Sequence, residues 1–209
     1  MEKQHVHNLI ILDESGSMGS IKSQIISGFN ETVQSIKGSQ KKFPEQEHFI
    51  SVVSFNDLAN KLLHFIDPVE KLNEIDADLY QPNAATPLFD AIGFAVTKLY
   101  SMVKNQEKCN VLVTIMTDGE ENASKEYSGK QIKELIEKLK QEKWTFTYIG
   151  TDHDVDQIAL KLSITNTLIF EKNEAGIKKM FEKDRTSRDV YYSKVRRNED
   201  TKDNFFEEL

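Results

Sequence analysis

The sequence predicts an α/β fold of three layers, in which a doubly wound, mostly parallel, Rossmann-like sheet carries helices on both faces. Short apolar segments of strand length alternate with amphipathic segments of helical length along the 209 residues, and this alternation is typical of parallel sheets. Two of the apolar segments, 7–13 and 110–117, are rich in Val, Ile and Leu. Such runs indicate strands that are buried on both faces.

The first predicted strand, over 7–13, is followed by a helix from Ile21 to near Gly38. Apolar residues recur there at intervals of three and four positions, which indicates one buried helix face, and glycine commonly ends a helix. Segments 49–55 and 62–66 are then expected to form two strands around a short turn. Because so short a connection joins antiparallel neighbours, we expect one antiparallel strand at an edge of the sheet.

The second half of the chain continues the alternation. Apolar residues at helical spacing between 88 and 102 predict the next helix, and the strand 110–117 follows it. The remaining predicted elements are a helix over 132–139, a strand over 144–149, a short helix over 155–162, a strand over 167–170 and a helix that begins at Asn173. The length suits a single domain, which we expect to cover 1–182.

The last segment, 183–209, is expected to be a charged helix end and tail. Residues 183–197 carry six Lys or Arg against two acids, whereas 198–209 carry five acids against one Lys. One interpretation is a solvated helix end with a frayed terminus. The other is a docking segment with the apolar anchors Val190, Tyr191, Tyr192, Val195, Phe205 and Phe206.

The overall composition argues against some classes of partner. Lys and Arg number 27 and Asp and Glu number 34, so the net charge is −7, which opposes binding to nucleic acid or to an anionic membrane. Cys109 is the single cysteine, and the apolar run near the N-terminus, Leu9–Leu12, is too short for a signal peptide or a membrane span. We therefore expect a cytoplasmic protein.

Polar side chains follow the two buried strands where ligands bind in open parallel sheets, at the carboxyl ends of the strands. Asp13, Ser15 and Ser17 follow the first strand, Asp118 follows the later one, and Thr86 lies in the loop before a helix. These side chains offer oxygen atoms and no imidazole or thiolate. Hard divalent cations, Mg²⁺ or Mn²⁺, prefer such a set. The sequence therefore predicts a metal site at this edge.

The pattern Asp-x-Ser-x-Ser, with the later Thr and Thr-Asp-Gly segments, resembles the metal-ion-dependent adhesion site of the von Willebrand factor type A domain, and the resemblance covers about residues 5–182. It implies that Ser15, Ser17 and Thr86 contact the metal, with Asp13 and Asp118 acting directly or through water. An Asp or Glu of a partner protein would fill the sixth position. Free-standing intracellular members of the family serve as adaptors for ATPase or stress-response assemblies, so the resemblance implies an adaptor or scaffold that is not an enzyme.

Three alternatives remain open. The Asp-x-Ser-x-Ser segment is also suited to capping a helix, and a type A fold can carry an empty site. The third alternative is a Mg²⁺-dependent phosphoryl-transfer or hydrolytic enzyme with Asp13 as nucleophile. That chemistry needs a cation for the phosphoryl group, and segments 13–19, 83–90 and 117–124 contain no Lys or Arg.

Other polar residues carry weaker expectations. Glu120, Glu121 and Asn122 are expected to form a solvated rim beside the site. His5 and His7 alternate on one strand face without a third nearby ligand, so we expect a surface or edge-strand position for them.

Overall fold

The structure is a computed structural model that describes residues 3–151 and 155–207. The strands are β1 (Gln4–Asp13), β2 (Gln46–Phe55), β3 (Asn60–Pro68), β4 (Cys109–Met116), β5 (Trp144–Thr151) and β6 (Asn166–Phe170). The helices are α1 (Lys22–Lys42), α2 (Leu88–Val103), α3 (Gly129–Lys140), α4 (Val155–Lys161) and α5 (Glu174–Arg196), with 3₁₀ turns at Gly16–Ile21 and Val69–Lys71.

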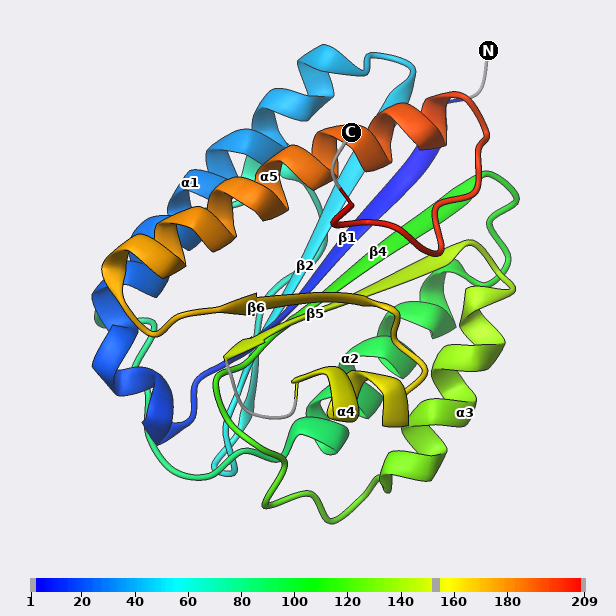
Figure 1. Ribbon diagram of the computed structural model, residues 1–209. Coiled ribbons are helices and arrows are strands. Elements are labelled where there is room, and N and C mark those ends of the chain that lie inside the picture. Colours follow the sequence, from blue (N-terminus) through cyan, green and yellow to red (C-terminus); the bar gives the residue numbers. More distant parts are fainter. Residues whose placement is uncertain (1–2, 152–154, 208–209) are drawn as a thin grey trace.

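The six strands form one sheet in the order β3-β2-β1-β4-β5-β6. β3 is antiparallel to β2, and all other neighbours are parallel. Helices α1 and α5 cover one face, while α2, α3 and α4 cover the other (Figure 1). The predicted fold class, including the single antiparallel edge strand, is confirmed.

The central strand β1 is buried on both faces, as its apolar run predicts. Leu9 and Ile11 pack in the layer beneath α2, α3 and α4, whereas Ile10 and Leu12 pack in the layer beneath α1 and α5. The expectation of a surface or edge position for His7 was wrong. Its side chain is 2% exposed and stacks on Phe49 at 4.9 Å, because β1 lies in the middle of the sheet rather than at its edge.

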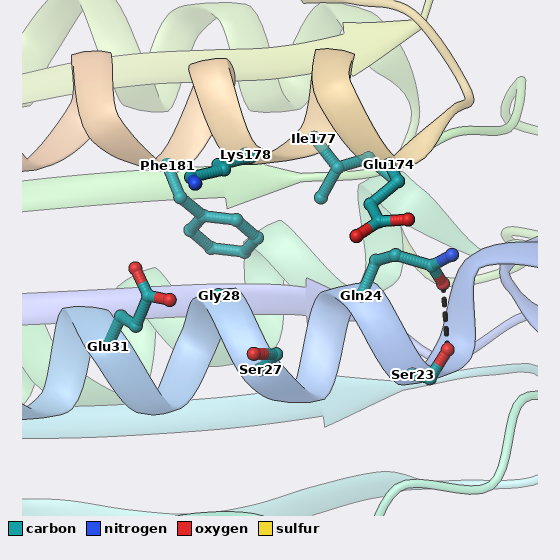
Figure 2. A pocket seen from close by; sticks show the side chains of 9 residues that line it. All are labelled: Ser23, Gln24, Ser27, Gly28, Glu31, Glu174, Ile177, Lys178 and Phe181. Carbon is teal, nitrogen blue, oxygen red and sulfur yellow. Dashed lines mark hydrogen bonds between the residues drawn. The ribbon is translucent and has the colours of Figure 1, made fainter.

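Helices α1 and α5 cross in close contact. A Cβ atom on Gly28 would lie 1.9 Å from the Phe181 ring, so glycine is needed where the two helices meet (Figure 2). The predicted end of α1 near Gly38 was wrong, since the helix continues to Lys42. Apart from the neighbouring residues and the nearby backbone of the same helix, no heavy atom lies within 4 Å of a Cβ built on Gly38, and an isolated glycine is tolerated inside a helix.

A buried polar network fastens the middle of α5 to the sheet. Arg188 donates to Asp184 at 2.8 Å and to Thr114 of β4 at 2.7 Å. The Tyr192 hydroxyl donates to Asn8 of β1 at 2.7 Å. Because buried charges are costly unless paired and hydrogen-bonded, these contacts specify where α5 lies on the sheet.

The chain after α5 folds back onto the same face. Phe205 packs in a buried cluster with Tyr191 and Val195, and the Thr145 hydroxyl donates to the backbone carbonyl of Thr201 at 3.0 Å. The residues regarded as docking anchors are thus largely covered by the chain itself. None of the helices within 3–151 and 155–207 combines the length and apolar character that crossing a bilayer requires.

Candidate metal centre

The five predicted site residues lie at one edge of the sheet, beside the ends of β1 and β4. Asp13 is the last residue of β1, and Asp118 follows β4 by two residues. These two strands are adjacent and lie where the strand order reverses direction. In doubly wound sheets this switch point is where ligands bind.

Oxygen atoms of three side chains, from two chain segments, converge beside Gly119. A Cβ atom at this glycine would lie 3.2 Å from Thr86 Oγ1, 3.3 Å from Ser17 Oγ and 3.9 Å from Asp13 Oδ2. A side chain at position 119 would therefore enter the space that these oxygens surround. Glycine keeps that space open.

The remaining two residues extend the oxygen set. Ser15 Oγ lies 3.1 Å from Ser17 Oγ, and Ser17 donates a hydrogen bond to Asp118 Oδ1 at 2.5 Å. Two adjacent ligands of an octahedral ion, each about 2.1 Å from it, are about 3.0 Å apart. The spacing of the two serine hydroxyls fits such an ion. Ser17 is also exposed, so the site is open to solvent.

The donor set has the chemistry of a hard-cation site. It combines hydroxyl and carboxylate oxygens, which suit Mg²⁺ or Mn²⁺. In the part of the chain that the structure describes, no group of three or more His, Cys, Asp or Glu side chains gathers as a metal site. The candidate site is of another kind, because it has two carboxylates and its other donors are hydroxyls.

Asp13 is held rigidly and carries a perturbed pKa. Its side chain is buried, with Oδ1 accepting from Ser15 N at 2.7 Å and Oδ2 accepting from the Thr117 hydroxyl at 2.6 Å. Burial raises the pKa of Asp13 to about 6, although the bonds from Thr117 and Ser15 lower it. A cation beside Asp13 would favour the ionised carboxylate.

The side chain of Glu14 holds the turn between Asp13 and Ser15 in place. It is fully buried, and its Oε1 pairs with Lys61 Nζ at 2.6 Å and accepts from Gln81 N at 2.6 Å. Ser54 donates to the other carboxylate oxygen. Nothing in the spacing of the sequence pointed to this role, because the partners come from β2, β3 and a distant loop.

The loop after Gly119 is tied to the loop that carries Thr86. Glu121 accepts hydrogen bonds from Phe89 N at 2.9 Å and Ser124 N at 2.7 Å. Asn122 Oδ1 accepts from Thr86 N at 2.9 Å. The interpretation of Glu121 as part of a solvated rim was wrong, since it is partly buried and its carboxylate fastens the two loops together. Asn122 is exposed, as expected for the rim, and also bonds to the Thr86 loop. Glu120 is exposed, as expected.

A cation that the sequence argument missed lies at the site. Lys172, between β6 and α5, places Nζ 2.5 Å from Asp118 Oδ2 and donates to the Ser17 carbonyl at 3.2 Å. The observation that three site segments lack Lys and Arg therefore did not exclude a cation here. Lys172 comes from a fourth segment, and no motif linked that segment to the site.

The family follows from the sequence as a whole. The profile of the von Willebrand factor type A domain matches residues 9–189. The chain belongs to this family. The matched range includes all five candidate site residues and most of α5. No curated protein matches the sequence.

Solved structures share the type A fold at low sequence identity. The vWF domain of the type V pili tip protein Mfa5 from Porphyromonas gingivalis has 11% identity and a TM-score of 0.61, with 90% of this chain and 96% of that chain covered. The SpRpn10 VWA domain has 12% identity and a TM-score of 0.52, with 92% and 96% covered.

A third similar structure is proximal thread matrix protein 1 from the mussel byssus, with 14% identity and a TM-score of 0.58. The alignment covers 87% of this chain and 47% of that protein. This chain thus spans about half the length of the byssus protein. At these identities the likeness establishes the fold.

Proposed function

We propose that this type A domain is a divalent-metal-dependent protein-binding module. Asp13, Ser15, Ser17, Thr86 and Asp118 would hold Mg²⁺, or Mn²⁺ in its place, and an Asp or Glu side chain of a partner protein would complete the coordination. The observation that carries the proposal is the convergence of Thr86, Ser17 and Asp13 oxygens on the space beside Gly119.

The hydrogen bonds around the site support this assignment of roles. Ser17 gives its proton to Asp118, which leaves its oxygen lone pairs free to face a cation. Thr117 and Ser15 N hold the two carboxylate oxygens of Asp13 in place. Since most donors are neutral hydroxyls, a bound ion would retain strong attraction for an incoming carboxylate.

The enzyme alternative ranks second. Lys172 supplies a cation to this edge, as phosphoryl transfer requires. However, that cation pairs with Asp118, and the proposed nucleophile Asp13 is 0% exposed with a hydrogen bond to each carboxylate oxygen. We therefore propose a binding role without catalysis. An Asp13-dependent acyl-phosphate formed from small phosphodonors would contradict this choice.

The cellular setting is also part of the proposal. We propose a cytoplasmic adaptor or scaffold whose partner belongs to an ATPase or stress-response assembly, as the family resemblance implies. The single cysteine supports a reducing compartment. Cys109 is buried, and burial raises the pKa of its thiol to about 11, so the thiol is unreactive. Nucleic acid and membranes are not proposed as partners.

The experiment that tests the metal site is a calorimetric titration of the protein with Mg²⁺ and with Mn²⁺. Ser17→Ala and Thr86→Val each remove one hydroxyl, and we expect each to weaken binding at least about tenfold, because a neutral ligand bond is lost. Ser27→Ala is the matched control, since Ser27 is an exposed serine of α1, ten residues from Ser17.

Partner binding is then tested by affinity capture in Mg²⁺ and in EDTA. A partner that is lost in EDTA and with Thr86→Val supports the module. Equal metal binding by all three variants, or a partner retained in every condition, would contradict the proposal.

A further inference from the structure

A cavity lies beside the candidate metal centre, lined by residues of α2, α3, α4 and the loop after Gly119. Its volume is about 520 Å³. Phe89, Ile158 and Leu162 supply its apolar surface, and the exposed side chains of Lys130 and Lys161 lie at its rim. Phe89 and Ile158 are only partly buried, so apolar surface is open to a ligand.

Two residues that line the cavity are close in sequence to residues of the candidate metal site. Phe89 follows Thr86 by three residues, at the start of α2, and Glu120 follows Gly119 directly. Glu120 thus stands within two residues of Asp118, a span of at most about 7 Å between Cα atoms. One extended peptide can therefore reach both places.

Hydrogen bonds hold the loop between the metal site and the cavity in one conformation. The Glu121 carboxylate accepts from the backbone of Phe89, Ala123 and Ser124 at 2.9, 2.9 and 2.7 Å, and from the Ser124 hydroxyl at 2.6 Å. Asp90 accepts from Lys125 N at 2.7 Å in the same loop. Because this loop is already ordered, a ligand binds without the entropic cost of ordering it, which favours affinity.

The absence of a side chain at Gly129 exposes the ring of Phe89. A Cβ at this position would lie 3.2 Å from Phe89 Cζ. The cavity lining also carries two lysines, Lys130 and Lys161, and two glutamates, Glu120 and Glu121, so its charges balance. The surface is therefore complementary to a large apolar side chain, whereas the preference for an acidic residue comes from the proposed metal site beside it.

We propose that this cavity is the specificity pocket of the module. The partner would be an acidic segment that places one carboxylate at the metal site and a large apolar side chain between Phe89 and Ile158. The exposed Lys130 and Lys161 would lie beside this acidic segment. This inference rests on the proposed metal-dependent binding and adds the second contact that selects among acidic segments.

The test is selection from a displayed library of random peptides in Mg²⁺, followed by fluorescence polarisation with the selected peptides. We expect selected peptides to share an acidic residue and a large apolar residue at a constant spacing. Ile158→Asn should remove the apolar preference, keep the acidic one, and weaken the selected peptides about tenfold, which is the effect of losing one buried apolar side chain.

A second variant keeps the test independent of core packing. The exposed pair Lys130→Glu with Lys161→Glu should weaken binding severalfold and reduce its salt dependence. Lys41→Glu with Lys104→Glu, at the ends of α1 and α2, changes the charge equally away from the cavity and should bind like the unaltered protein.

The outcomes separate the two levels of the proposal. Selected peptides that bind equally in EDTA and to Thr86→Val would refute metal-dependent binding itself. A Mg²⁺-dependent acidic motif without an apolar preference, or an apolar preference that Ile158→Asn leaves unchanged, would refute the pocket alone. A library without enriched peptides would also overturn the inference.

Discussion

Replacing Lys172 with methionine should make the protein bind Mg²⁺ more tightly. In the structure described here, the Lys172 ammonium pairs with Asp118 at 2.5 Å. An ion that uses Asp118 must first displace this ammonium, so the free energy of the ion pair is subtracted from that of metal binding. Methionine keeps the length of the side chain and removes the charge.

The size of the effect follows from the exposure of the pair. The direct attraction over 2.5 Å is about 6 to 7 kcal/mol at an effective dielectric constant of about 20. Desolvation and screening offset most of it, since the Lys172 side chain is 36% exposed while that of Asp118 is 0% exposed. Exposed pairs contribute up to about 1 kcal/mol, and removing one partner of a buried pair costs about 3 to 5 kcal/mol. A net 1 to 2 kcal/mol corresponds to about 5- to 30-fold tighter metal binding.

Calorimetry and thermal unfolding measure this effect together. Lys172→Met should have a lower melting temperature than the unaltered protein without metal, because Asp118 loses its partner, and a larger upward shift when Mg²⁺ is added. Lys178→Met, an exposed lysine of α5, is the control (Figure 2). A folded Lys172→Met protein with unchanged or weaker Mg²⁺ affinity would refute the reasoning.

Three further predictions concern stability, each measured by urea unfolding. Gly28→Ala should lower the free energy of unfolding by about 1 to 3 kcal/mol, because its Cβ would clash with Phe181. Gly38→Ala, in the same helix, should raise the free energy of unfolding by up to about 1 kcal/mol. Equal effects of the two substitutions would contradict the α1–α5 packing. Burial lowers the pKa of His48 to about 4. The stability that the neutral imidazole contributes is therefore complete above pH 6.5 and is lost as the pH falls from 6.5 towards 4. His48→Leu should remove about 2 to 3 kcal/mol of the stability lost between pH 7 and 4.5, and an unchanged pH profile would argue against a neutral buried imidazole. Glu121→Gln should lower the free energy of unfolding by about 1 to 3 kcal/mol, since an amide oxygen cannot replace both carboxylate oxygens as acceptors. An unchanged free energy of unfolding would mean that this carboxylate does not fasten the loop.

The fold could be predicted because its elements follow from local patterns. Continuous apolar runs identified the central strands β1 and β4, and helical spacing identified the segments between strands. The site followed from a rule of topology, since polar residues after adjacent parallel strands meet at one edge. Ser17 and Asp118, 101 positions apart, are hydrogen-bonded as a result.

Contacts that depend on distant segments could not be predicted in this way. Lys172 reaches Asp118 through the geometry of the β6–α5 connection, which no motif encodes. Glu14 and Glu121 carry the same charge as surface residues, and only the finished fold shows that each accepts several hydrogen bonds. The burial of His7 depended on the position of β1 in the sheet, which the strand pattern alone does not give.

The most direct test of a metal-dependent site is anomalous diffraction from a crystal of the protein grown with Mn²⁺. The account predicts one peak at the edge of the sheet, about 2.1 Å from the hydroxyls of Ser15 and Ser17, with the Lys172 ammonium displaced from Asp118. A peak elsewhere, or no peak at saturating Mn²⁺ with Lys172 still paired to Asp118, would contradict it.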